Sequence, residues 1–143
     1  MIVGAADHED EYSRGLIQQQ SERIVFTGRQ APATVAALYE NASLFVLPSY
    51  HEGLPLVALE AMSHGLPVLL SDIEANKDVD LQPANYFRTG DIDHLAEKLR
   101  SICSIPVSNP ALLQRFDWDP ISCETMHLYF DLMAQQSAVT LRC

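Results

Sequence analysis

The chain has 143 residues, about one ordinary domain, and 48% of them are hydrophobic, so it can bury a core and is not globally disordered. Its 19 acidic and 9 basic side chains give a formal net charge of −10, which argues against a nucleic acid polymer as partner, because binding many phosphates needs lysine and arginine. A single nucleotide stays compatible with this charge, since backbone N–H groups can hold a diphosphate.

The cysteines and histidines indicate neither disulfides nor a metal site. Cys103, Cys123 and Cys143 are widely spaced, odd in number and without a CxxC pair, which indicates a reducing compartment and hence a cytoplasmic protein. The five histidines form no HxxxH or HxH pair, so no metal is expected. No apolar run reaches the roughly 18 residues of a membrane span. No basic segment followed by an apolar one opens the chain, so no signal peptide is predicted.

Short apolar runs alternate with helical patterns along the chain. In the first half of the chain, the sequence predicts a strand end at 2–5, a helix at 11–20, a strand at 23–27, a helix opening at 31–32 and a strand at 44–47. A helix at 55–64, a strand at 68–70, a loop at 76–83 and a short strand at 85–88 follow. The chain then forms a helix capped by Asp91 and a last helix from Trp118. Val35, Leu38 and Tyr39 have the i, i+3, i+4 spacing of one buried helix face. Gly65 and Pro67 together form a helix-stop signal.

This alternation predicts an α/β fold, a three-layer Rossmann-like domain with a parallel sheet covered on both faces. Ligands of such sheets bind beyond the carboxyl ends of the strands. Gly28, residues 49–56 and residues 71–76 all follow predicted strands and should share that edge. We assign residues 1–136 to one domain and expect residues 137–143 to form a frayed tail. Because the chain opens on the last residues of a strand, we expect it to be cut from something longer.

A helix start flanked by two carboxylates follows the strand at 44–47. The predicted binding residues are Glu52, Gly53, Leu54, Pro55, Leu56, Val57 and Glu60. With Pro55 as the first helical residue, the free N–H groups of Leu56 and Val57 would form an anion site suited to a diphosphate. Glu60 lies about 7 Å further along the axis, where a carboxylate could accept hydrogen bonds from ribose hydroxyls. Glu52, before the helix, could accept hydrogen bonds from hydroxyls of the group that is attached to the diphosphate.

Each glutamate taken alone is more simply explained as a solvated charge. Around Glu60, however, the helix is apolar on nearly all sides, which predicts a largely buried helix whose carboxylate needs a partner or a wet cleft.

Residues 48–68 resemble the E-x7-E signature of the retaining GT-B glycosyltransferases of group 1, family 4, in the form PS-x-x-EG-x-x-x-x-x-LEAM-x-x-G-x-PV. The resemblance extends from residue 2 to about residue 133. It implies the C-terminal, donor-binding half of a GT-B fold, and a transfer of a sugar from a UDP- or GDP-sugar with retention and without a metal or other cofactor. It also implies that Glu52 is the catalytic residue and contacts the donor sugar, and that Glu60 contacts the ribose. The Gly28-Arg29 loop would lie beside the nucleobase.

The family's basic pair and its acceptor-binding N-terminal domain would precede Met1, so we expect this chain to recognise a donor without completing the transfer alone. The missing domain is then a partner, and the apolar side of the last helix, with Met126, Tyr129, Phe130 and Met133, would be exposed and could pair two copies. Two alternatives stay open. One is a non-catalytic binding or assembly module with the same fold, and the other is a related GT-B synthase or phosphorylase.

Overall fold

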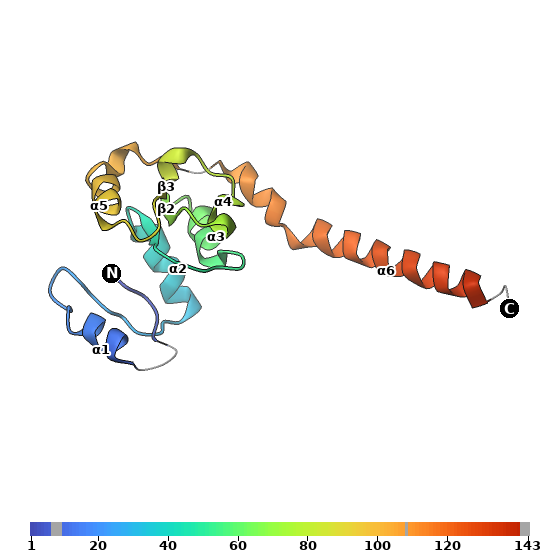
Figure 1. Cartoon of the computed structure of the whole chain (residues 1–143), viewed down its shortest axis with the longest axis horizontal. Helices are drawn as coiled ribbons and strands as arrows, with labels where there is room; N and C mark the ends of the chain where they lie inside the picture. The colour runs from blue at the N-terminus through green and yellow to red at the C-terminus, as the bar shows by residue number, and fades with distance from the viewer. Residues whose placement is uncertain (7–9, 108, 141–143) are drawn as a thin grey trace.

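A computed structural model describes residues 1–6, 10–107 and 109–140. Its centre is a parallel sheet of three short strands with the spatial order β1-β2-β3 (Figure 1). The strands are β1 (Phe45–Leu47), β2 (Val68–Ser71) and β3 (Tyr86–Phe87). Val46 pairs with Leu69 and Leu70 pairs with Tyr86, which fixes the register. All four residues of β2 are buried, whereas β1, at one edge, is half-buried.

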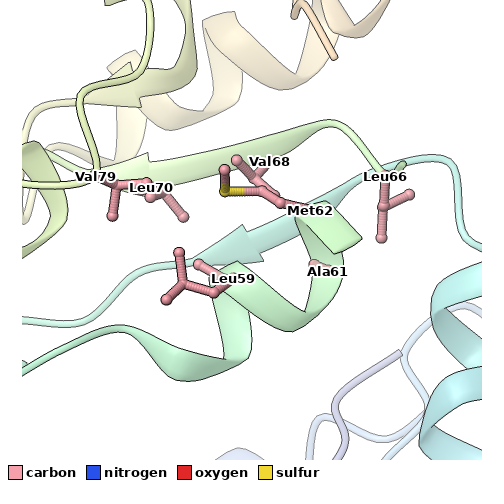
Figure 2. Packing of buried hydrophobic residues seen from close by; sticks show 8 residues of the cluster. Leu59, Ala61, Met62, Leu66, Val68, Leu70 and Val79 are labelled. Carbon is pink, nitrogen blue, oxygen red and sulfur yellow. The ribbon is translucent and has the colours of Figure 1, made fainter. Parts of the chain in front are cut away.

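The two faces of β2 pack into two separate apolar clusters. On one face Val68 and Leu70 contact the buried side of α3 (Leu56–Ser63), where Leu59 and Met62 point at the strand (Figure 2). On the other face Leu69 packs with Phe87 and Ile105, and Leu95 of α5 (Ile92–Arg100) lies against them. Helices therefore cover both faces of a parallel sheet, and the predicted three-layer α/β architecture is confirmed.

The predicted helices are present with small differences at their ends. The remaining elements are α1 (Glu11–Ile17), α2 (Pro32–Asn41), α4 (Glu74–Lys77), α6 (Trp118–Thr140) and three 3-10 helices at Pro83–Asn85, Ile102–Ser104 and Pro110–Phe116. The short helix α4 occupies the start of the predicted loop at 76–83. Asp91 caps α5 as predicted, because its side chain accepts a hydrogen bond from the His94 N–H group.

The end of α3 confirms the predicted stop signal. Gly65 has a φ of +71°, the left-handed conformation that favours glycine. The Gly65 N–H group donates to Met62 O at 2.9 Å, and the Leu66 N–H group donates to Ala61 O at 3.1 Å. These two bonds form a Schellman motif, which turns the chain directly into β2.

The predicted strands at 2–5 and 23–27 do not form, and this is a correction. The two segments meet only in two isolated pairings, Ile2 with Phe26 and Gly4 with Gly28, outside the three-stranded sheet. Ile2 and Val25 keep 48% and 39% of their surface exposed. Two paired segments that bury so little apolar surface do not extend into regular strands, since a two-stranded ribbon is marginal in water.

The last helix, α6, projects from the body of the molecule (Figure 1). Its apolar side chains are exposed, with Tyr129 at 62% and Phe130 at 59%. The helix runs through Thr140, and residues 141–143 of the predicted tail lie outside the described residues. Within the described chain, α6 included, no helix has both the length and the apolar character needed to cross a membrane.

Candidate functional site

Polar side chains join the loops that follow β1 and β2. Ser71, the last residue of β2, donates from Oγ to the backbone oxygen of Ser49 at 2.6 Å. Asn76 of α4 donates from Nδ2 to Ser71 O at 2.8 Å and to Ser71 Oγ at 3.0 Å. Ser71 and Asn76 are fully buried. The loop that carries Ser49 and Glu52 is therefore anchored to the carboxyl end of the central strand, as expected for a parallel sheet.

Glu52 lies half-buried in this loop, just before α3. The Ser49 hydroxyl donates to Glu52 Oε1 at 2.7 Å. Among the residues that the structure describes, none forms a hydrogen bond or ion pair with Oε2. One carboxylate oxygen is thus held by the protein, and the other keeps its capacity to accept hydrogen bonds.

The start of α3 differs from the prediction at Pro55 and Leu56. Pro55 is the buried N-cap residue with φ −76° and ψ 68°, and the helix begins at Leu56. These angles and the 2.8 Å bond from the Leu56 N–H group to Leu54 O define an inverse γ-turn. The Leu56 N–H group is therefore engaged and not free, which corrects the prediction. The Val57 N–H group has no partner among the described residues, so it is the one that the helix start presents.

Glu60 lies on the exposed side of α3, while Ala58, Leu59, Ala61 and Met62 form its buried side. The expectation of a largely buried helix is met on this one side only, and the carboxylate lies on the solvent side of the helix. The Tyr39 hydroxyl, from α2, lies 3.3 Å from Val57 O and 3.4 Å from Glu60 Oε2 and can donate to either. Burial, followed by the charge of Glu60, raises the pKa of Tyr39, so this hydroxyl stays a donor up to high pH.

A hollow of about 440 Å³ opens beside Glu60. It is lined by Leu56, Leu59, Glu60, Ser63, Leu113, Phe116 and Trp118. Its aromatic wall is formed by Phe116, the last residue of the 3-10 helix Pro110–Phe116, and Trp118, the first residue of α6, both far along the chain from Glu60. Sequence patterns contain no signal for this wall.

A second anchored carboxylate, Asp72, follows β2. Its Oδ1 accepts from both the N–H group and the hydroxyl of Thr89 at 2.8 Å. The Thr89 N–H bond is the main cause of the lowered pKa of Asp72. Asp72 therefore joins the loops after β2 and β3 at the same edge of the sheet.

Gly28 and Arg29 lie in the segment before α2. Gly28 has a φ of +67°, and the Gly4 N–H group donates to its backbone oxygen at 2.9 Å. The Arg29 side chain is exposed. Their assignment to a nucleobase stays a prediction, as does the assignment of Glu52, Gly53, Leu54, Pro55, Leu56, Val57 and Glu60 to a donor.

Sequence reasoning missed Ser49, Ser71, Thr89 and the Tyr39 hydroxyl as members of the site. The i, i+3 spacing of Ser49 and Glu52 was the one local signal, since a serine three residues before a glutamate can reach it across a turn. Across residues 1–6, 10–107 and 109–140, no group of three or more His, Cys, Asp or Glu side chains is arranged to hold a metal ion.

A parallel sheet covered on both faces, with polar loops and a helix start at its carboxyl edge, defines a Rossmann-like ligand-binding domain. Residues 1–104 match the family described as glycosyl transferases group 1, and the chain belongs to that family. Its fold is the C-terminal half of a GT-B fold.

The chain is similar to known proteins of this family in both sequence and structure. The alpha-galactosylglucosyldiacylglycerol synthase of Streptococcus pneumoniae is 30% identical over 73% of this chain and 26% of that protein. The phosphatidyl-myo-inositol mannosyltransferase of Mycobacterium leprae is 28% identical over 97% of this chain and 39% of that protein. The solved structure of sucrose-phosphate synthase from Thermosynechococcus elongatus matches with a TM-score of 0.74 and 26% identity, over 93% of this chain and 38% of that chain. This chain therefore spans between 26% and 39% of the length of these relatives.

Proposed function

We propose that this chain is the donor-binding domain of a retaining hexosyltransferase, which moves a sugar from a UDP- or GDP-sugar to a carbohydrate or lipid-linked acceptor. Membership of the family supports the sugar transfer. The names of two relatives, a glycosyldiacylglycerol synthase and a phosphatidyl-inositol mannosyltransferase, support a lipid-linked acceptor. The observation that carries the proposal is Glu52, whose Oε2 stays open at the start of α3.

In this proposal, the helix start holds the diphosphate between two polyols. The Val57 N–H group and the positive end of the α3 dipole attract the diphosphate. Glu52 accepts from hydroxyls of the transferred sugar on one side, and Glu60 accepts from ribose hydroxyls on the other. Gly53 allows the backbone to approach the ligand closely, and nothing occupies the space where a Cβ would lie.

The reaction needs more than this chain contributes. Retention by attack on the same face of the sugar requires no protein nucleophile, and Glu52 then orients the donor and stabilises charge as the diphosphate leaves. Since the chain covers well under half of its relatives, we propose that the acceptor site and the groups that aid departure come from the rest of a longer enzyme. The cytoplasmic location stays a prediction. A homodimer through α6 is a further proposal, supported by its exposed apolar side chains.

Calorimetric titration tests the donor-binding role. We expect UDP-glucose with UDP, or GDP-mannose with GDP, to bind, and Glu52→Gln to weaken the sugar nucleotide while leaving the bare diphosphate unchanged. Binding of none of these, nor of ADP, would contradict the proposal and favour a non-catalytic module. A preference for ADP-glucose would instead favour a GT-B synthase.

A further inference from the structure

Among the residues that the structure describes, one hydrogen bond holds the carboxylate of Glu52. Its side chain has three rotatable bonds, and the hydroxyl of Ser49 is the group that holds it, at 2.7 Å from Oε1. A hydroxyl that donates to a carboxylate at this distance forms a charge-assisted bond, which is stronger than a bond between neutral groups. Without this bond, the carboxylate would rotate among several staggered conformers, and only some of them would keep Oε2 facing the ligand.

Ser49 is itself held by buried groups. Its backbone oxygen accepts from Ser71 Oγ at 2.6 Å, and Ser71 Oγ accepts in turn from Asn76 Nδ2 at 3.0 Å. Asn76 Oδ1 is buried without a partner among the described residues, so the bonds from Nδ2 to Ser71 orient this amide. The Asn76 amide also polarises the Ser71 hydroxyl, because Ser71 accepts and donates through the same oxygen.

We propose that Ser49 is a positioning residue for Glu52. Its hydroxyl holds Oε1 and so directs Oε2 toward a hydroxyl of the transferred sugar. The buried pair Ser71 and Asn76 keeps Ser49 in place from the end of β2. This inference rests on the proposed donor-binding function. It predicts that Ser49 contributes to the affinity for the sugar part of the ligand but not to the affinity for the nucleotide part.

The experiment measures the affinity of this chain for UDP-glucose and for UDP, and for GDP-mannose and GDP, by calorimetry. The variants are Ser49→Ala, Ser49→Thr and Glu52→Gln, with Ser101→Ala as the matched control. Ser101 is exposed, and within the described part of the chain its hydroxyl bonds only to the backbone of its own helix end, at Glu97 O and Lys98 O. Thermal unfolding of each variant separates a local effect from a loss of fold.

We expect Ser49→Ala to weaken binding of the sugar nucleotide roughly tenfold, the lower end of the effect of one hydrogen bond to a charged group, because the site is partly exposed. Affinity for the bare diphosphate and the melting temperature should not change, and Ser49→Thr, which keeps the hydroxyl, should restore binding. Ser71→Ala gives a second measurement. We expect it to weaken binding of the sugar nucleotide less than Ser49→Ala does.

Two results overturn the inference in distinguishable ways. If Glu52→Gln weakens the sugar nucleotide but Ser49→Ala does not, Ser49 has no positioning role and the donor-binding proposal stands. If Glu52→Gln has no effect on the sugar nucleotide, or if nothing binds, the proposed function fails and the role of Ser49 fails with it. An equal loss for sugar nucleotide and diphosphate in Ser49→Ala would indicate general loop damage and would also refute the inference.

Discussion

Replacing Glu60 by alanine should weaken nucleotide binding through the ribose. The carboxylate lies on the exposed side of α3, and its Oε2 is 3.4 Å from the Tyr39 hydroxyl. A hydrogen bond of this length is weak. Binding of a ligand hydroxyl would therefore displace little that already stabilises the carboxylate.

The expected loss of affinity in Glu60→Ala follows from the exposure of the Glu60 carboxylate. Hydrogen bonds to charged groups contribute about 1.5–3 kcal/mol, and an exposed acceptor belongs at the lower end of that range. A loss of about 1.5 kcal/mol corresponds to roughly tenfold weaker binding. Wild-type protein should discriminate against 2′-deoxy-UDP by a similar factor, because that ligand lacks one of the two hydroxyls.

Calorimetry with UDP and 2′-deoxy-UDP gives the assay. We expect wild-type protein to prefer UDP and Glu60→Ala to bind both ligands equally. The control is Glu40→Ala. Glu40 is an exposed glutamate of α2, and its carboxylate lies 3.7 Å from Nδ1 of His64, at the C-terminal end of α3. Its removal changes the net charge by the same amount. If Glu60→Ala still prefers UDP as the wild type does, Glu60 does not bind the ribose. If Glu40→Ala causes the same loss, the effect is one of charge alone.

Three further predictions concern stability and association. Leu70→Ala, at a fully buried site facing α3, should lower the free energy of unfolding by about 2–5 kcal/mol in urea titration, and a loss below about 1 kcal/mol would contradict the packing described. The lowered pKa of Asp72 means that its contribution to stability is present above its unfolded pKa of about 3.9 and is lost as the pH falls through the lower folded value. Thr89→Val removes the hydroxyl donor to Asp72 and keeps the N–H donor, so acid unfolding should depend somewhat less steeply on pH, and an unchanged profile would show that the hydroxyl does not help to lower the pKa of Asp72. Phe130→Glu, at an exposed position of α6, should reduce any concentration-dependent dimer seen in sedimentation, and an unaffected dimer would place the contact elsewhere.

Local sequence determines several parts of this fold well enough to predict them. Gly65 ends α3 by adopting a left-handed conformation, and the hydrogen bonds that accompany it reach only to Ala61 and Met62, about one helical turn away. The apolar run at Val68 to Leu70 forms a strand buried on both faces, since its residues alternate between two apolar clusters. The cap at Asp91 likewise needs only the N–H group of His94, three residues away.

Other features depend on packing that no local pattern contains. The run at 2–5 has the same apolar character as β2, but Ile2 has no apolar layer above it and forms only an isolated pairing. The exposed side of α3 was also unpredictable, because Leu56 and Val57 are apolar and yet largely exposed. The polar residues Glu60 and Ser63, three positions apart, mark the exposed side, but Leu56 and Val57 on that side hide this pattern.

The two glutamates of the site are held in the same way from different directions. Ser49, from the loop after β1, donates to one oxygen of Glu52, and Tyr39, from α2, can donate to one oxygen of Glu60. Each carboxylate thus keeps one oxygen that no described residue engages, and the Val57 N–H group, between the two glutamates in the sequence, is an unused donor. Because the γ-turn at Pro55 uses the Leu56 N–H group, the helix start presents fewer donors than an ordinary one. If the proposed donor-binding role holds, we therefore expect affinity to depend more on the hydroxyls at the two ends of the nucleotide sugar than on the diphosphate in its middle.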